Sequence, residues 1–108
     1  MNDGITSKRL ELIDKTIAAG SKDPFPLYAR AMELRSLGRK DDAMAAYGEI
    51  RDRFGAYVPT YLMAAQLAQE LGKTDEARRW AETGAERARA AHDDHALSEL
   101  GTFLSSLG

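Results

Sequence analysis

Apolar residues recur along much of the chain at intervals of three and four positions, the spacing of one face of an α-helix. Leu10, Ile13 and Ile17 follow this spacing near the start of the chain. No segment alternates apolar and polar residues in the way that a half-buried β-strand would. Alanine is the commonest residue type, and valine and isoleucine are scarce, which favours helix over strand. The sequence therefore predicts an all-α protein.

Glycine and proline divide this helical pattern into segments. Gly20, Gly38 and Gly72 each follow a helical run, at the position where helices commonly end in a left-handed residue. Asp23 precedes Pro24, and an acidic cap followed by proline is typical of a helix start. We expect Thr74 or Asp75 to cap the fifth helix, and Leu97, Leu100 and Leu104 to form the inner face of the last. The predicted helices run over residues 5–19, 24–37, 40–53, 59–71, 74–90 and 94–106.

One seven-residue segment occurs twice. Residues 37–43 read LGRKDDA and residues 71–77 read LGKTDEA, so the two copies are 34 residues apart. Ala31 and Ala65 keep the same spacing. In such a unit the glycine reverses the backbone between two helices, and the small alanines let those helices approach closely. The chain therefore contains a helix–turn–helix unit that repeats with a period of 34 residues.

The two units, residues 24–57 and 58–91, resemble tetratricopeptide repeats. The resemblance is carried by alanines, the turn glycine and aromatic or leucine positions, namely Ala31/Ala65, Gly38/Gly72, Ala43/Ala77, Tyr47 and Leu27/Tyr61. It implies a right-handed α-solenoid of antiparallel helix pairs with two full repeats. Because such arrays need about three units to bury their apolar faces, we expect helices 5–19 and 94–106 to cap the stack. Residues 1–108 then form a single domain.

The second unit departs from the repeat pattern. It has Ala81 where the first unit has Tyr47, and Trp80 stands one residue earlier. Gly84 and Ile50 occupy a position where this family usually has alanine. These departures bear on how the second unit packs against the last helix.

Composition and charge exclude several classes of protein. The chain has no cysteine and a formal net charge of −2, so it offers no disulfide framework, no thiolate metal site and no coherent basic surface for nucleic acid. We expect no export signal, because residues 1–4 are acidic and polar and because charged residues (Lys8, Arg9, Glu11, Asp14 and Lys15) interrupt any apolar run after them. No run of apolar residues is long enough to cross a bilayer. We therefore expect a cytoplasmic protein that binds neither nucleic acid nor membrane.

Two short motifs raise the question of catalysis. Residues 72–74 (Gly-Lys-Thr) match the end of a phosphate-binding loop, but that loop needs an earlier glycine, where Leu67 stands, and a preceding strand. Residues 92–95 (His-Asp-Asp-His) hold side chains that bind metals; the aspartates, however, stand where a helix cap is expected and no distant third ligand is evident. No serine lies in a nucleophile elbow. The sequence is interpreted as a non-enzyme without cofactor or metal.

The first helix of each repeat supplies the candidate binding surface. In the tetratricopeptide family, residues of this helix that face away from its partner helix line a groove for a peptide or helix. The corresponding positions are Phe25, Tyr28, Ala29, Met32, Arg35 and Ser36 in the first unit, and Leu62, Met63, Gln66, Gln69 and Glu70 in the second. Apolar anchors with a polar rim are typical of a partner-binding patch. The alternative is that some of them, Phe25 and Leu62 especially, belong to the core.

Two functions follow from this surface. The first is an adaptor that binds a peptide or helix of another protein in the groove. The second is a self-associating structural module, in which the same surface or the last helix closes a homodimer. A chaperone-tail adaptor is disfavoured, because Ala29 and Met63 stand where that subfamily would have asparagine.

Overall fold

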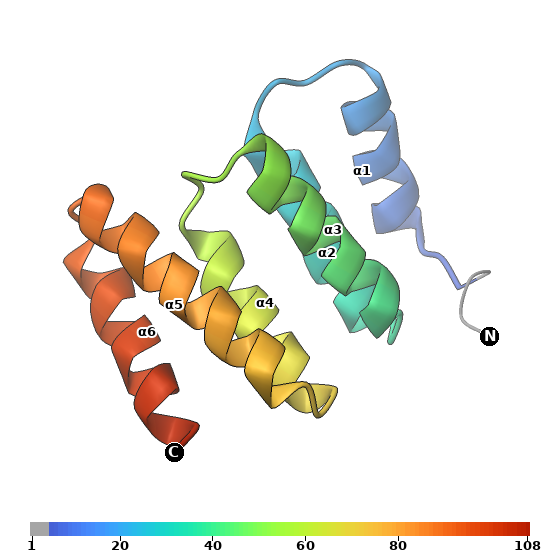
Figure 1. Ribbon diagram of the computed structural model, residues 1–108. Helices are drawn as coiled ribbons and strands as arrows, with labels where there is room; N and C mark the ends of the chain where they lie inside the picture. Colours follow the sequence, from blue (N-terminus) through green and yellow to red (C-terminus); the bar gives the residue numbers. More distant parts are fainter. Residues whose placement is uncertain (1–4) are drawn as a thin grey trace. The chain divides into compact units, whose positions relative to one another are not determined.

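The computed structural model describes residues 5–108, which fold into six α-helices without any β-strand in that range (Figure 1). Residues 1–4, on which the expectation of no export signal rests in part, lie outside the described residues. The helices are α1 (Lys8–Ala18), α2 (Pro24–Ser36), α3 (Lys40–Arg53), α4 (Pro59–Glu70), α5 (Thr74–Ala90) and α6 (Asp94–Ser106). The all-α prediction is confirmed, and each of the six predicted segments overlaps one of these helices.

The chain divides into two compact units, and the first ends at Arg53. In this unit α2 packs against α3, and α1 packs against α2. The core lies between α2 and α3, where Ala31, Leu34 and Tyr47 are fully buried. The two alanine positions at the pair, Ala31 and Ala43, have no exposed surface, which agrees with the close approach that the repeat pattern predicts.

The second unit, residues 54–108, contains α4, α5 and α6. Here α5 packs against both α4 and α6, and α4 also contacts α6; Figure 1 shows α6 running alongside α5. Tyr61 of α4 is fully buried, with its ring centroid 5.9 Å from that of Trp80 and its hydroxyl donating to the Gly55 carbonyl at 2.5 Å. Trp80, one residue before Ala81, therefore packs against Tyr61, whereas Tyr47 of the first unit packs against Tyr28.

Three turns between helices share one backbone geometry. Gly38, Gly72 and His92 all have positive φ, at 79°, 76° and 56°. In each turn the next residue donates to a carbonyl five positions earlier, as Lys73 does to Ala68 at 2.9 Å. This is the Schellman arrangement that glycine favours. The glycine prediction is confirmed, and His92 takes the same conformation despite its side chain.

Two local predictions are wrong in detail. Helix α1 begins at Lys8 rather than Ile5, because the Ser7 hydroxyl accepts a hydrogen bond from the Leu10 amide at 3.0 Å and caps the helix there. Helix α5 has Lys73 at its N-cap without a side-chain hydrogen bond, so neither Thr74 nor Asp75 caps it. Asp75 lies in the first turn instead, where a carboxylate complements the positive end of the helix.

The inner face of α6 also differs slightly from the prediction. Leu100 is buried as expected, but Leu97 and Leu104 are only half-buried, and Phe103 is buried beside Leu100. The buried face of α6 is therefore centred on positions 100 and 103, which lie three residues apart on one side of the helix. None of the helices between residues 5 and 108 is long and apolar enough to cross a membrane.

Candidate functional site

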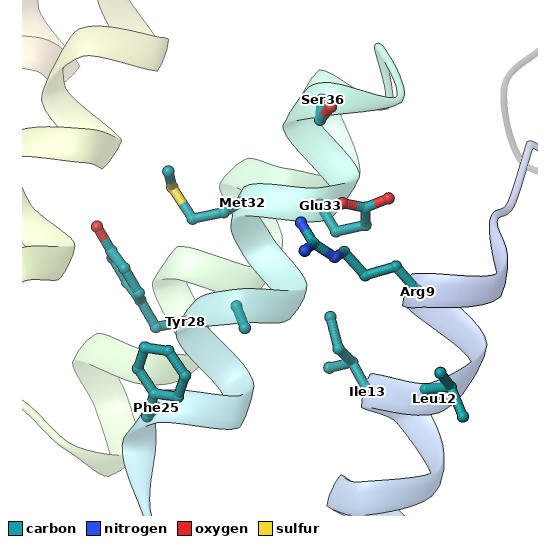
Figure 2. A pocket seen from close by; sticks show the side chains of 9 residues that line it. Arg9, Leu12, Ile13, Phe25, Tyr28, Met32, Glu33 and Ser36 are labelled. Atoms are coloured by element: carbon teal, nitrogen blue, oxygen red, sulfur yellow. The ribbon is translucent and has the colours of Figure 1, made fainter.

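The first unit carries an open groove of about 650 Å³ between α1 and α2 (Figure 2). We call it the α1–α2 groove. Its lining is mostly apolar, with a few polar side chains, and consists of Arg9, Leu12, Ile13, Phe25, Tyr28, Ala29, Met32, Glu33 and Ser36. All of these residues come from the first unit, so the groove is complete within a single compact unit.

Helix α2 presents two faces with different roles. Asp23 caps the helix by accepting from the Phe25 amide at 3.0 Å, so the helix begins at Pro24. Leu27 and Leu34 point into the core. Phe25 and Met32, seven positions apart and therefore on one face, line the groove instead. The helical repeat alone thus separates the packing face of α2 from its groove face.

Tyr47 of α3 supports the groove from below. It has no exposed surface, and its hydroxyl donates to the sulfur of Met32 at 3.1 Å. The ring of Tyr28 packs at a tilt against the ring of Tyr47, with 6.5 Å between centroids. Two groove side chains, Tyr28 and Met32, therefore rest on a buried aromatic residue, and the core of the repeat holds this part of the groove wall in place.

The groove gathers most of the large apolar side chains that remain exposed. Leu12 is 63% exposed, Phe25 57% and Met32 37%, and Ile5 is the one further large apolar residue that is exposed among residues 5–108. Single exposed apolar residues are ordinary, but a contiguous group is typical of a binding surface. Phe25 therefore belongs to the surface and not to the core.

Polar groups stand at one end of the groove. The Ser7 hydroxyl, which caps α1, donates to the Glu33 carboxylate at 2.8 Å. Arg9 extends from α1 toward α2 close to Glu33 (Figure 2). Arg30 of α2 also pairs with Asp14 of α1 at 2.8 Å. Polar contacts thus tie α1 to α2 alongside the burial of Leu10.

The structure brings together only part of the predicted site. Phe25, Tyr28 and Met32 line the α1–α2 groove together with Ala29 and Ser36. Arg35 is half-buried and does not line it. The second-unit positions lie on α4, where Leu62, Met63 and Gln66 are half-buried and Gln69 and Glu70 are exposed. The role of all these residues in binding stays a prediction.

Sequence reasoning missed the contribution of α1. It treated this helix as a cap, whereas Arg9, Leu12 and Ile13 form one wall of the groove. A signal was present in Leu12, an apolar residue that lies off the Leu10–Ile17 stripe. Glu33 was missed as well, because its place at the groove depends on how α1 crosses α2.

The two motifs considered for catalysis have structural roles. Gly72 and Lys73 lie in the turn between α4 and α5, and Thr74 begins α5, as the interpretation as a turn predicted. Asp93 caps α6 by accepting from the Ala96 amide at 3.0 Å, which confirms the cap. His95 lies 3.2 Å from Glu99 on the exposed side of α6. Within residues 5–108, no group of three or more histidine, cysteine or acidic side chains is placed to hold a metal ion.

Several proteins of known structure share this fold. The chain is 31% identical to a tetratricopeptide repeat domain protein from Salinibacter ruber. Its solution structure matches with a TM-score of 0.77 over 80% of this chain and 87% of that one. A crystal structure of a tetratricopeptide repeat domain protein from Salinibacter ruber matches with a TM-score of 0.74, 31% identity and coverage of 80% and 96%. A Bordetella parapertussis protein, 20% identical, shares the fold with a TM-score of 0.80 over 94% of this chain and 89% of that one.

A comparison with protein-family models gives no match, and neither does a comparison with curated proteins. The fold of the structural neighbours is a helical repeat solenoid, a non-enzymatic repeat fold that suggests a protein–protein interaction module in general. The identity and coverage, together with the 34-residue period of the sequence, support one conclusion: the chain belongs to the tetratricopeptide repeat family.

Proposed function

We propose that this protein is an adaptor that binds a peptide or helical segment of another protein in the α1–α2 groove. The observation that carries the proposal is that Leu12, Phe25 and Met32, three of the four large apolar side chains exposed among residues 5–108, all line one groove. Removing such side chains from water is the main favourable term in association, and a few of them dominate binding energy in most interfaces.

Two features suit this groove to a segment rather than to a flat protein surface. It is a trough between two helices, and Ala29 lies within it, where a small side chain leaves room for a bulky one from a partner. Tyr28 and Met32 both contact buried Tyr47. These contacts restrict the rotamers of the two side chains before a partner binds, which lowers the entropic cost of binding.

The proposal extends to α4 of the second unit. Leu62, Met63, Gln66 and Gln69 occupy the positions that correspond to the groove residues of α2 and are proposed to bind a partner in the same way. A cytoplasmic location also stays a prediction, based on the absence of cysteine.

The test uses peptides selected on the intact protein from a displayed random library, with affinity measured by fluorescence anisotropy. Leu12→Ser and the double substitution Tyr28→Ala with Met32→Ala are expected to weaken binding by tenfold or more. Ile5→Ser is the matched control, because Ile5 is also a large exposed apolar residue, at 41%, but does not line the groove. Far-UV circular dichroism verifies that each variant stays helical.

Equal affinity in all of these variants would move the binding site away from the groove. Self-association is the competing function, and sedimentation equilibrium at micromolar concentration separates the two. A dimer that Leu12→Ser dissociates would place a second copy of this chain on the groove, whereas a monomer that binds the selected peptides supports the adaptor.

A further inference from the structure

We propose that the groove selects partner segments in which a bulky apolar face is followed, at one end, by an acidic side chain that pairs with Arg9. This inference rests on the proposed function and names the chemistry of the partner. Two charged residues, Arg9 and Glu33, line the groove. They differ in the hydrogen bonds and ion pairs that they form with other residues of the protein.

Glu33 is already engaged within the fold. Its carboxylate accepts a hydrogen bond from the Ser7 hydroxyl at 2.8 Å, and the same hydroxyl accepts from the Leu10 amide. Glu33 is therefore held at the N-terminus of α1, where the helix dipole places a partial positive charge. A cation from a partner would have to compete with both of these interactions.

Arg9 has no comparable engagement. No other residue in the range 5–108 forms a hydrogen bond or ion pair with its guanidinium. The neighbouring arginines differ in this respect, because Arg30 is paired with Asp14, and Arg39 binds both Asp42 and the Ile5 carbonyl. Arg9 is thus the charge of the groove that remains available to a ligand, and a guanidinium binds carboxylates with favourable geometry.

The two ends of the groove differ in polarity, so a bound segment has a preferred orientation. Phe25 and Ser36 mark the two ends of the groove face of α2, which lie roughly 16 Å apart at about 1.5 Å of rise per residue. The Phe25 end is apolar, whereas Glu33, Ser36 and Arg9 stand at the other end. A bound segment therefore places its apolar anchors near Phe25 and Leu12 and its acidic residue near Ser36.

The experiment uses synthetic 14-residue amphipathic helical peptides with one leucine and phenylalanine stripe. Two glutamates, two glutamines or two lysines follow the stripe, at either end of the peptide. Affinity for the intact protein is measured by fluorescence anisotropy at two salt concentrations. Arg9→Gln and Arg9→Glu are the test variants. Lys15→Gln is the matched control, because Lys15 is an exposed cation of the same helix that does not line the groove.

The protein is expected to prefer the glutamate peptide over the lysine peptide by roughly three- to tenfold at low salt, and less at high salt. Arg9→Gln removes this preference, Arg9→Glu reverses it, and Lys15→Gln leaves it intact. Apolar peptides that bind equally whatever their charge, in a manner sensitive to Leu12→Ser, would overturn this inference and leave the proposed function standing. Failure of every peptide to bind would overturn both.

Discussion

Gly84 offers the sharpest test of how the second unit is packed. A methyl group built on this glycine overlaps the Cβ of Tyr61 and lies 3.1 Å from the Leu100 side chain. Tyr61 Cβ is fixed to the backbone of α4, so a rotamer change cannot move it away. Gly84→Ala therefore forces α4 and α5 apart, although alanine is the residue that the family usually has at this position.

The size of the effect follows from two opposing terms. Alanine gains about 1 kcal/mol over glycine in a helix interior. Overpacking in a tight core costs about 1–3 kcal/mol, and this site is at the upper end because both Tyr61 and Leu100 are fully enclosed. We expect a net loss of about 1–2 kcal/mol, which lowers Tm by roughly 5–10 °C for a domain of this size.

Gly101 is the matched control in the neighbouring helix. It is exposed within α6, and a methyl group there meets nothing within 4 Å. Gly101→Ala therefore raises stability by up to about 1 kcal/mol. Urea unfolding followed by far-UV circular dichroism measures both variants. If Gly84→Ala proved as stable as Gly101→Ala, the close approach of α5 to α4 would be refuted.

Two further predictions concern backbone and capping. His92→Gly is expected to stabilise the protein by roughly 0.5–1 kcal/mol in thermal unfolding, because glycine adopts the positive φ of 56° without the strain that a side chain adds; a lower Tm would show that the histidine side chain contributes to the turn. Ser7→Ala removes the α1 cap and is expected to cost about 1 kcal/mol, seen as faster hydrogen exchange of the α1 amides while those of α3 keep their protection; unchanged exchange in α1 would contradict the capping role.

Local chemistry explains why the helices could be predicted from sequence. Gly38 and Gly72 end helices because of their own backbone freedom, and Asp23 and Asp93 cap the helices that follow them. Such signals involve neighbours in the chain and need no knowledge of the tertiary fold. His92 escaped this reasoning because its positive φ is set by the turn and not by its residue type.

The candidate site was less accessible to sequence reasoning because it depends on contacts between distant residues. The repeat pattern placed Phe25, Tyr28 and Met32 on one face of α2, since residues three and four apart share a face. The opposite wall of the groove comes from α1, and its position is set by contacts such as Ser7 with Glu33, which are 26 residues apart. No periodicity within α1 reveals that Leu12 lines an open groove together with residues of α2.

The two terminal helices should contribute unequally to stability. Helix α6 buries Leu100 and Phe103 and contacts both α5 and α4, whereas α1 buries only Leu10. At about 1.5–3 kcal/mol for each fully buried large apolar side chain, a chain that ends at Ala91 is expected to lose about 3–6 kcal/mol. A chain that begins at Ser21 is expected to lose about 1.5–3 kcal/mol.

Chemical denaturation of the two truncated chains measures this difference, and sedimentation reports whether the newly exposed face causes association. Loss of α6 is expected to be the more severe change and to promote self-association, because the apolar surface that Leu100 and Phe103 cover returns to water. A chain ending at Ala91 that stayed monomeric with undiminished stability would show that α6 does not cap the second unit. Loss of α1 instead removes a wall of the groove, so peptide binding should fall further than stability does.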